Sequence, residues 1–360
     1  MRRRRRTLIA VLATLTAATG LSATSASAAA PAEAGTLARA GAHGPGLENC
    51  TATVCHFDVA PGTYDVHVLL GGGDAAASTG ITGETRRTLL PETATAAGER
   101  VARSFTVNVR TPEGEPTGPD GTPGLDLVLG GSAPALAGIR VTPARPHTRQ
   151  IFLVGDSTSC DQPGAPYSGW GQQLPQYLRK GLSAANYADS GESTVSYLDN
   201  PALFATVQPL IRKGDLVLIQ LAHNDKQTDE ATYRTNLETL VAGVRERGGR
   251  PVLLTPIVRR WFSADGTLNN DTALLVNGLG VDHPAVTRSV AAAHGVPLID
   301  MTAKTKALVE SLGVEASKAL YLYNEKRDNT HTSANGATVY ADLVRDELVA
   351  QRLVPRGLVR

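Results

Sequence analysis

Beyond the first thirty residues, the sequence contains no apolar run long enough to cross a bilayer, which takes about 20 strongly apolar residues. It also lacks a His-Glu-x-x-His motif and a Cys-x-x-Cys pair, the usual ligand patterns of zinc sites, so we expect neither a metal nor another cofactor. No serine stands in a Gly-x-Ser-x-Gly frame, which argues against the nucleophile elbow of a general α/β-hydrolase. These absences leave chemistry that ordinary side chains can perform.

The first thirty residues have the three parts of an export signal. Residues 2–6 are all arginine, residues 8–21 are largely apolar, and Ala26-Ser27-Ala28 is a small-residue cleavage site. We therefore predict a signal peptide over residues 1–30 and a secreted protein, exported by either the general or the twin-arginine route. Cleavage removes five arginines and lowers the formal net charge from +1 to −4. Without a basic stripe, the mature chain is not expected to bind nucleic acid, and we expect it to be a monomer.

Apolar and polar residues alternate through much of residues 49–143, for example in residues 64–69 and 105–109. This alternation is typical of short strands, so we predict an antiparallel β-sandwich domain over residues 49–145. Residues 31–48 precede it as a flexible lead-in, and the polar residues 143–149 form a linker. The mature chain of about 330 residues is longer than one hydrophobic core usually serves, which also favours two domains.

After Gln150, short apolar runs alternate with longer amphipathic stretches, which is typical of a parallel sheet covered by helices on both faces. The expected strands cover residues 151–154, 184–188, 216–221, 251–255 and 297–299. The expected helices cover residues 170–180, 230–247, 283–294, 304–312 and 334–351, the last following the good N-caps Thr332 and Ser333. We therefore predict an α/β fold, with a three-layer α/β/α catalytic domain over residues 150–354.

Polar sequences follow three of these strands. They are Gly155-Asp156-Ser157-Thr158, Asp189-Ser190-Gly191 and His223-Asn224-Asp225. Because ligands of such sheets gather where the strands end on their carboxyl side, we expect the three loops to converge there.

Ser157 follows a strand and a glycine that allows a tight turn, so its hydroxyl and backbone N–H can both face outward. A serine hydroxyl is a poor nucleophile until a base takes its proton, and His331, in the polar loop before the last helix, is the candidate base. Asp328 can fold back within one turn to accept the imidazole Nδ1–H. We predict that these residues form a catalytic triad; the alternatives are an ordinary turn at Ser157 and a solvated surface pair at Asp328 and His331.

A tetrahedral intermediate needs hydrogen-bond donors aimed at its oxyanion. The candidates are the backbone N–H groups of Ser157 and Gly191 and the side-chain amide of Asn224. His223 could contact the substrate or pin the loop that carries Asn224, and we favour loop support.

Two further kinds of side chain are candidates for substrate binding. Asp156 stands directly before the predicted nucleophile. Trp170 and Trp261 could stack on sugar rings, although an isolated tryptophan is at least as often part of the core.

Three cysteines in an exported protein allow one disulfide and leave one thiol. We expect Cys50 and Cys55 to pair, because they flank a short strand-like segment and could close a hairpin. Cys160, three residues after Ser157, could be a catalytic thiol or a small buried side chain, and we favour the buried one.

Four sequence blocks stand in the order and approximate spacing found in the SGNH (GDSL-like) hydrolase superfamily, which the chain resembles over residues 151–353. They are Gly155-Asp156-Ser157-Thr158, the glycine Gly191, His223-Asn224-Asp225 and Asp328-Asn329-Thr330-His331. The first and last blocks, with residues 168–172 and 255–260, look like the rhamnogalacturonan acetylesterase branch. The resemblance implies that Ser157 is the nucleophile, that Gly191 and Asn224 are oxyanion donors, and that Asp328 and His331 complete the triad.

Two residues depart from the pattern of that branch. Ala222 stands where glycine is more frequent, and Glu192 stands where a basic residue is frequent, which changes the charge beside the pocket. Residues 49–143 loosely resemble galactose-binding-like sandwich modules, which implies a possible carbohydrate-binding role.

The resemblance implies a secreted serine esterase that hydrolyses acetyl or other short acyl esters on plant cell-wall polysaccharide such as rhamnogalacturonan. A GDSL-type lipase, a general carboxylesterase and a xylan acetylesterase are alternatives, because the loops that shape the acyl and alcohol pockets cannot be derived from the sequence. A non-catalytic carbohydrate-binding protein is an alternative of another class.

Overall fold

The computed structural model describes residues 46–360, which lie in one compact unit. The predicted signal peptide and most of the predicted lead-in lie outside the described residues. A 3₁₀-helix, η1 (Leu47–Asn49), begins within the last residues of that lead-in. No helix in the described part of the chain is long and apolar enough to span a membrane.

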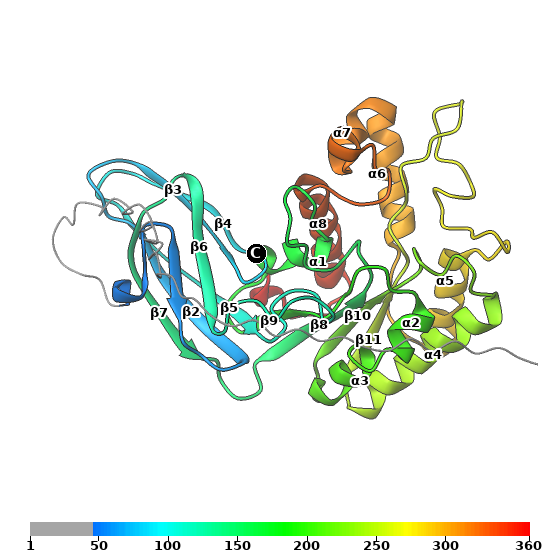
Figure 1. Ribbon diagram of the computed structural model, residues 1–360, viewed down its shortest axis with the longest axis horizontal. Coiled ribbons are helices and arrows are strands. Elements are labelled where there is room, and N and C mark those ends of the chain that lie inside the picture. Colours follow the sequence, from blue (N-terminus) through cyan, green and yellow to red (C-terminus); the bar gives the residue numbers. More distant parts are fainter. Residues whose placement is uncertain (1–45) are drawn as a thin grey trace, which may run out of the picture. The chain divides into compact units, whose positions relative to one another are not determined.

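Residues 54–143 form seven antiparallel strands in two sheets (Figure 1). The strands are β1 (Val54–Phe57), β2 (Gly62–Gly71), β3 (Ala77–Gly83), β4 (Arg87–Thr95), β5 (Arg100–Val109), β6 (Leu125–Ala133) and β7 (Leu136–Pro143). One sheet has the order β1-β6-β3-β4 and the other β5-β2-β7. We call these residues the β-rich region. The predicted antiparallel strands are confirmed, and the alternating residues 64–69 and 105–109 lie in β2 and β5.

One apolar core serves both sheets of the β-rich region. Alternate residues of β2, among them Val66, Val68 and Leu70, are buried in the same cluster as Leu125 and Leu127 of β6. These side chains share one core because alternate residues of a strand point to the same face of the sheet, and that face is apolar. At the N-terminal end of the region Cys50 and Cys55 form a disulfide, as predicted.

Residues 149–299 contribute a five-stranded sheet with the order β12-β11-β10-β8-β9, in which all neighbouring strands are parallel. The strands are β8 (Arg149–Gly155), β9 (Leu182–Asn186), β10 (Leu216–Gln220), β11 (Arg250–Leu254) and β12 (Leu298–Ile299). The predicted α/β fold with a parallel sheet is therefore confirmed.

Helices cover both faces of the parallel sheet (Figure 1). They are α1 (Trp170–Gln173), α2 (Thr194–Asp199), α3 (Phe204–Val207), α4 (Glu230–Glu246), α5 (His283–His294), α6 (Met301–Ala316), α7 (Tyr323–Lys326) and α8 (Ala334–Ala350). Ile151 and Leu153 of β8 share a core with α1, α6 and α8, whereas Phe152 and Val154 share another with α2, α3, α4 and α5. Successive residues of one strand thus face opposite layers, which requires the runs of apolar residues seen in the sequence.

The helix boundaries follow local sequence signals, with one correction. The predicted helix over residues 170–180 ends at Gln173 and continues as a 3₁₀-helix, η2 (Leu174–Tyr177), with Pro175 in its first turn. Proline lacks the N–H that an α-helix interior needs, so the longer helix is not formed. Before α8, Ser333 is the N-cap and its side chain accepts from Gly336 N–H, as the sequence indicated. Three further 3₁₀-helices are η3 (Gln208–Leu210), η4 (Ser317–Leu320) and η5 (Arg356–Leu358).

The β3–β4 turn contains a buried carboxyl group that makes stability depend on pH. Both side-chain oxygens of Glu84 are buried without a hydrogen-bond partner among the described residues. Burial raises the pKa of Glu84 from 4.5 to about 8, although the positive charge of Arg87 opposes the shift. The folded protein therefore holds this proton at neutral pH, while the unfolded chain releases it. The contribution of this group to stability is complete below pH 4.5 and is lost as the pH rises towards 8.

We expect Glu84→Gln to stabilise the protein at pH 8 by more than about 1 kcal/mol and to have little effect at pH 4.5, because the amide cannot ionise. Thermal unfolding at the two pH values measures the difference. The exposed Glu48→Gln is the matched control, with no expected change at either pH. An equal shift for Glu84→Gln at both pH values would contradict the assignment.

Candidate active site

Ser157 lies in a tight turn directly after β8. The N–H groups of Ser159 and Cys160 donate to the Asp156 carbonyl at 2.9 and 3.1 Å, which closes the turn. A Cβ on Gly155 would lie 2.2 Å from Ser159 Oγ and 3.0 Å from the Gln220 carbonyl oxygen, so this position requires glycine. The side chain of Ser157 is 6% exposed.

The structure brings Ser157, His331 and Asp328 together. Ser157 Oγ lies 3.1 Å from His331 Nε2, and His331 Nδ1 lies 2.6 Å from Asp328 Oδ2. Since an ionised carboxylate can only accept, Nδ1 carries the hydrogen and Nε2 is left to accept the serine proton. These contacts have the geometry of a nucleophile, a base and the group that orients the base.

Asp328 is held in place by hydrogen bonds from the backbone of its own loop. Its Oδ1 accepts from the backbone N–H groups of Thr330 and His331 at 2.7 and 3.0 Å. Burial alone would raise the pKa of Asp328, but the hydrogen bonds from the His331 ring and from these two N–H groups lower it to about 2. Asp328 is therefore ionised throughout the neutral range and can stabilise an imidazolium.

Tyr167, which is not among the residues predicted from the sequence, contacts both partners of the serine–histidine pair. Its hydroxyl donates to the Ser157 carbonyl at 3.1 Å, and its ring centroid lies 5.0 Å from that of His331. Burial raises the pKa of Tyr167, so it remains a neutral donor. No motif marks this residue; only the neighbouring block at residues 168–172 pointed to this part of the chain.

The loops that carry the candidate oxyanion donors contact each other. The side-chain Nδ2 of Asn224 donates to the Glu192 carbonyl at 3.1 Å, which joins the loop after β10 to the loop after β9. Gly191 is exposed and has a φ of 85°, in the left-handed region that favours glycine. Within residues 46–360, neither its N–H nor that of Ser157 donates to a protein acceptor, so both are available to a ligand.

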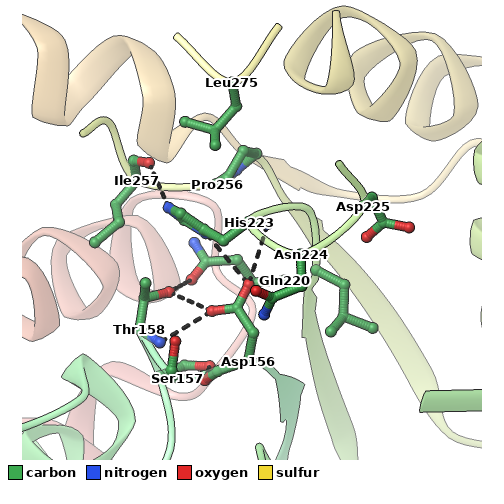
Figure 2. A network of polar contacts seen from close by, with 12 residues as sticks. Asp156, Ser157, Thr158, Gln220, His223, Asn224, Asp225, Pro256, Ile257 and Leu275 are labelled. Carbon is green, nitrogen blue, oxygen red and sulfur yellow. Dashed lines mark hydrogen bonds and ion pairs between the residues drawn. The ribbon is translucent and has the colours of Figure 1, made fainter. Parts of the chain in front are cut away.

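Asp156 and His223 are buried in a polar network beside the candidate nucleophile (Figure 2). Asp156 Oδ1 accepts from the N–H and the hydroxyl of Thr158 at 2.9 and 2.7 Å. Its Oδ2 lies 3.2 Å from His223 Nδ1, and His223 Nε2 lies 3.1 Å from the Ile257 carbonyl oxygen. Burial would raise the pKa of Asp156, but the charge and hydrogen bond of His223 lower it. Both side chains support loops, so the predicted substrate contact of Asp156 and the less favoured one of His223 are corrected.

The predicted stacking of Trp170 on a sugar is also wrong, because its side chain is 1% exposed and belongs to the core beneath α1 and α8. Its indole N–H donates to Gln220 Oε1 at 2.8 Å, which satisfies the one polar atom of a buried ring. Trp261, by contrast, is 47% exposed.

Cys160 is the buried thiol that the sequence favoured. Burial and the neighbouring carboxylate of Glu115 raise the pKa of its thiol well above the usual range, so it is not a nucleophile at neutral pH. Its Sγ lies 2.9 Å from Glu115 Oε1. Among the described residues, no group of three or more histidine, cysteine, aspartate or glutamate side chains could hold a metal ion.

Comparison with known proteins shows the family of this chain. Residues 153–339, more than half of the chain, match the sequence model of the GDSL-like Lipase/Acylhydrolase family. The chain belongs to this family. It is accordingly a carboxylic ester hydrolase, and all four sequence blocks lie within the matched region.

Two relatives in this family are rhamnogalacturonan acetylesterases by name. Rhamnogalacturonan acetylesterase RhgT of Bacillus subtilis is 36% identical over 213 residues, which cover 55% of this chain and 88% of the relative. A probable rhamnogalacturonan acetylesterase of the same organism, YesY, is 29% identical over 204 residues, which cover 54% and 89%.

A solved structure supports the fold over more of the chain. The crystal structure of the Bacillus subtilis protein YxiM superposes with a TM-score of 0.51 at 23% identity and covers 83% of this chain and 80% of that one.

The ring of His331 depends on Asp328 for its orientation, which predicts the effect of replacing the carboxylate. We expect Asp328→Asn to lower kcat for an ester on the order of 10³–10⁴-fold with little change in KM, because the wrong tautomer is favoured. Steady-state hydrolysis of 4-nitrophenyl acetate measures the effect. Asp199→Asn, at an exposed position in α2, is the control. More than a tenth of the normal kcat in Asp328→Asn would contradict the role of this carboxylate.

Proposed function

We propose that the chain is a secreted, monomeric acetylesterase that removes acetyl or other short acyl groups from plant cell-wall polysaccharide such as rhamnogalacturonan. The observation that carries the chemistry is the contact of Ser157 Oγ with His331 Nε2 at 3.1 Å, with Asp328 behind the ring. The ester hydrolase class follows from the family; the acyl group, the polymer and the export are parts of this proposal.

The reaction proceeds in two halves. His331 Nε2 takes the proton of Ser157 Oγ as the oxygen attacks the ester carbonyl, and a tetrahedral intermediate forms. His331 then gives the proton to the leaving sugar hydroxyl, which leaves an acyl-serine. Water repeats the sequence: it loses a proton to His331, attacks the acyl carbon and releases acetate, and the proton returns to Ser157.

Three donors are available to the oxyanion of each intermediate. The N–H groups of Ser157 and Gly191 have no protein acceptor within the described residues. The Asn224 amide carries two hydrogens, so one can hold the Glu192 carbonyl while the other faces the acyl oxygen. Removing one such donor costs on the order of 10²–10³ in turnover.

The substrate class is supported by the two acetylesterase relatives and by the charges beside the site. Arg259 lies against the loop after β10, where its Nη2 donates to the His223 carbonyl at 2.8 Å, and a cation there favours a polymer with carboxylate groups. Glu192, on the loop after β9, is an acid whose pKa is raised by burial.

We expect Ser157→Ala and His331→Ala each to lose at least about 10³-fold in kcat on 4-nitrophenyl acetate, because each removes a partner of the proton transfer. Ser263→Ala, at an exposed serine, is the control. A fluorophosphonate should label the unmodified protein at Ser157 and should not label His331→Ala. Near-normal hydrolysis by either variant would overturn the mechanism.

The substrate is tested separately on the unmodified protein. Acetate release is measured from acetylated rhamnogalacturonan, acetylated xylan and a short-chain triglyceride at equal ester concentration. We expect the first to be preferred. A preference for xylan or for triglyceride would contradict the proposed substrate class but not the proposed mechanism.

A further inference from the structure

The β5–β6 loop of the β-rich region, residues 110–124, contacts the loop that carries Gly191. Glu115 Oε1 accepts from the backbone N–H of Ser190 at 2.8 Å. The backbone N–H and the hydroxyl of Thr117 donate to Asp189 Oδ1 and Oδ2 at 2.9 and 2.8 Å. Asp189 and Ser190 are the two residues that directly precede Gly191 in the chain.

The same carboxylate also reaches the turn of the candidate nucleophile. Cys160, whose Sγ lies 2.9 Å from Glu115 Oε1, follows Ser157 by three residues. One oxygen atom of the β-rich region therefore joins the turn after β8 to the loop after β9. The two N–H groups proposed to hold the oxyanion lie on these two segments.

The base of the β5–β6 loop is fixed against the hydrolase as well. Arg87 Nε lies 2.6 Å from Asp161 Oδ2 in a fully buried ion pair, and the other two nitrogens of Arg87 donate to the carbonyls of Asn108 and Glu113 at 2.8 and 2.5 Å. A buried and paired guanidinium leaves little freedom to the backbone groups that it holds. Glu115 and Thr117 thus lie on a loop whose first residues are anchored up to Glu113.

Gly191 has no side chain that could fix its backbone. Apart from its two chain neighbours, no atom of residues 46–360 lies within 4 Å of the position that a Cβ would occupy, and its positive φ is a conformation that glycine enters and leaves easily. Other polar contacts also join this loop to the site: Asn224 Nδ2 donates to the Glu192 carbonyl, Asp189 N–H donates to the Gly155 carbonyl at 3.1 Å, and Ser190 Oγ lies 3.0 Å from Gln162 Nε2. Of all these contacts, the bond from Ser190 N–H to Glu115 is the one at the backbone of the residue directly before Gly191.

We propose that Glu115 and Thr117 are positioning residues that fix the backbone N–H of Gly191 relative to Ser157, so that the β-rich region is a working part of this active site. The inference rests on the proposed function, since it assigns a task to the Gly191 N–H. Both residues lie outside the family match at residues 153–339, so the family alone does not supply these contacts. An oxyanion donor displaced by a fraction of an ångström loses much of its effect on the transition state and little of its effect on substrate binding.

The test compares kcat and KM on 4-nitrophenyl acetate in the full chain. We expect Glu115→Ala to lower kcat about tenfold to a hundredfold with KM changed less than about twofold. Glu115→Gln should restore most of kcat, because its amide oxygen can still accept from Ser190 N–H. Thr117→Val should lower kcat less, because the Thr117 N–H remains, and Thr117→Ser should behave as the unmodified chain. Glu113→Gln is the control, since its carboxylate accepts from Thr122 N–H in its own loop.

Hydrogen exchange at residues 187–193 gives a second measurement that does not depend on catalysis. The Ser190 amide should exchange faster in Glu115→Ala than in the unmodified chain, whereas Glu113→Gln should not change it. The inference is overturned if kcat of Glu115→Ala stays within about twofold of normal, or if Glu115→Gln loses as much kcat as Glu115→Ala. Failure of the proposed function is a different result: the unmodified chain would neither hydrolyse the ester nor react with a fluorophosphonate at Ser157.

Discussion

The arrangement of the active site depends on the buried carboxylate of Asp156. A buried charge without partners costs several kcal/mol, so the chain must supply them, and it does so from two different loops. Thr158 donates to one carboxylate oxygen, and His223 lies against the other (Figure 2). Ser157 and Asn224 are each adjacent in sequence to a member of this network. The candidate nucleophile and one candidate oxyanion donor are therefore joined through a fully buried carboxylate.

The histidine is positioned by a separate constraint, the start of α8. The His331 carbonyl accepts from Leu322 N–H at 2.9 Å, and the Ser168 and Ala334 N–H groups join the flanking residues to the segment that contains Tyr167. Ser333 caps the helix directly after this turn. Because Asp328 bonds to the ring and to the backbone of the same turn, the base and its orienting group form one local unit. The site is complete when this unit packs against the turn after β8.

The sequence predicts the sheet and the Ser157–His331–Asp328 arrangement because both leave local signals: apolar runs, polar loops at strand ends, and a helix cap. It does not predict what depends on tertiary packing. Trp170 and Asp156 look like binding residues because nothing local marks a polar or aromatic side chain as buried. Strand β3 has the small, polar sequence ASTGITG, and β4 contains Pro91, so neither shows clear apolar alternation. The contacts of Glu115 join residues 45 and 75 positions apart, beyond the reach of any motif.

The contacts of the β-rich region argue against a tethered module that moves independently of the hydrolase. Breaking the buried Arg87–Asp161 pair would leave a charge without its partner at a cost of about 3–5 kcal/mol. Arg86 adds two contacts, with Nη1 donating to the carbonyls of Gln162 and Tyr167 at 2.8 and 3.1 Å. Tyr167 in turn contacts Ser157 and His331, so this second attachment also ends beside the site. A carbohydrate held by the β-rich region would therefore be presented at a fixed distance from the serine, and its contribution would be to orientation as well as to affinity.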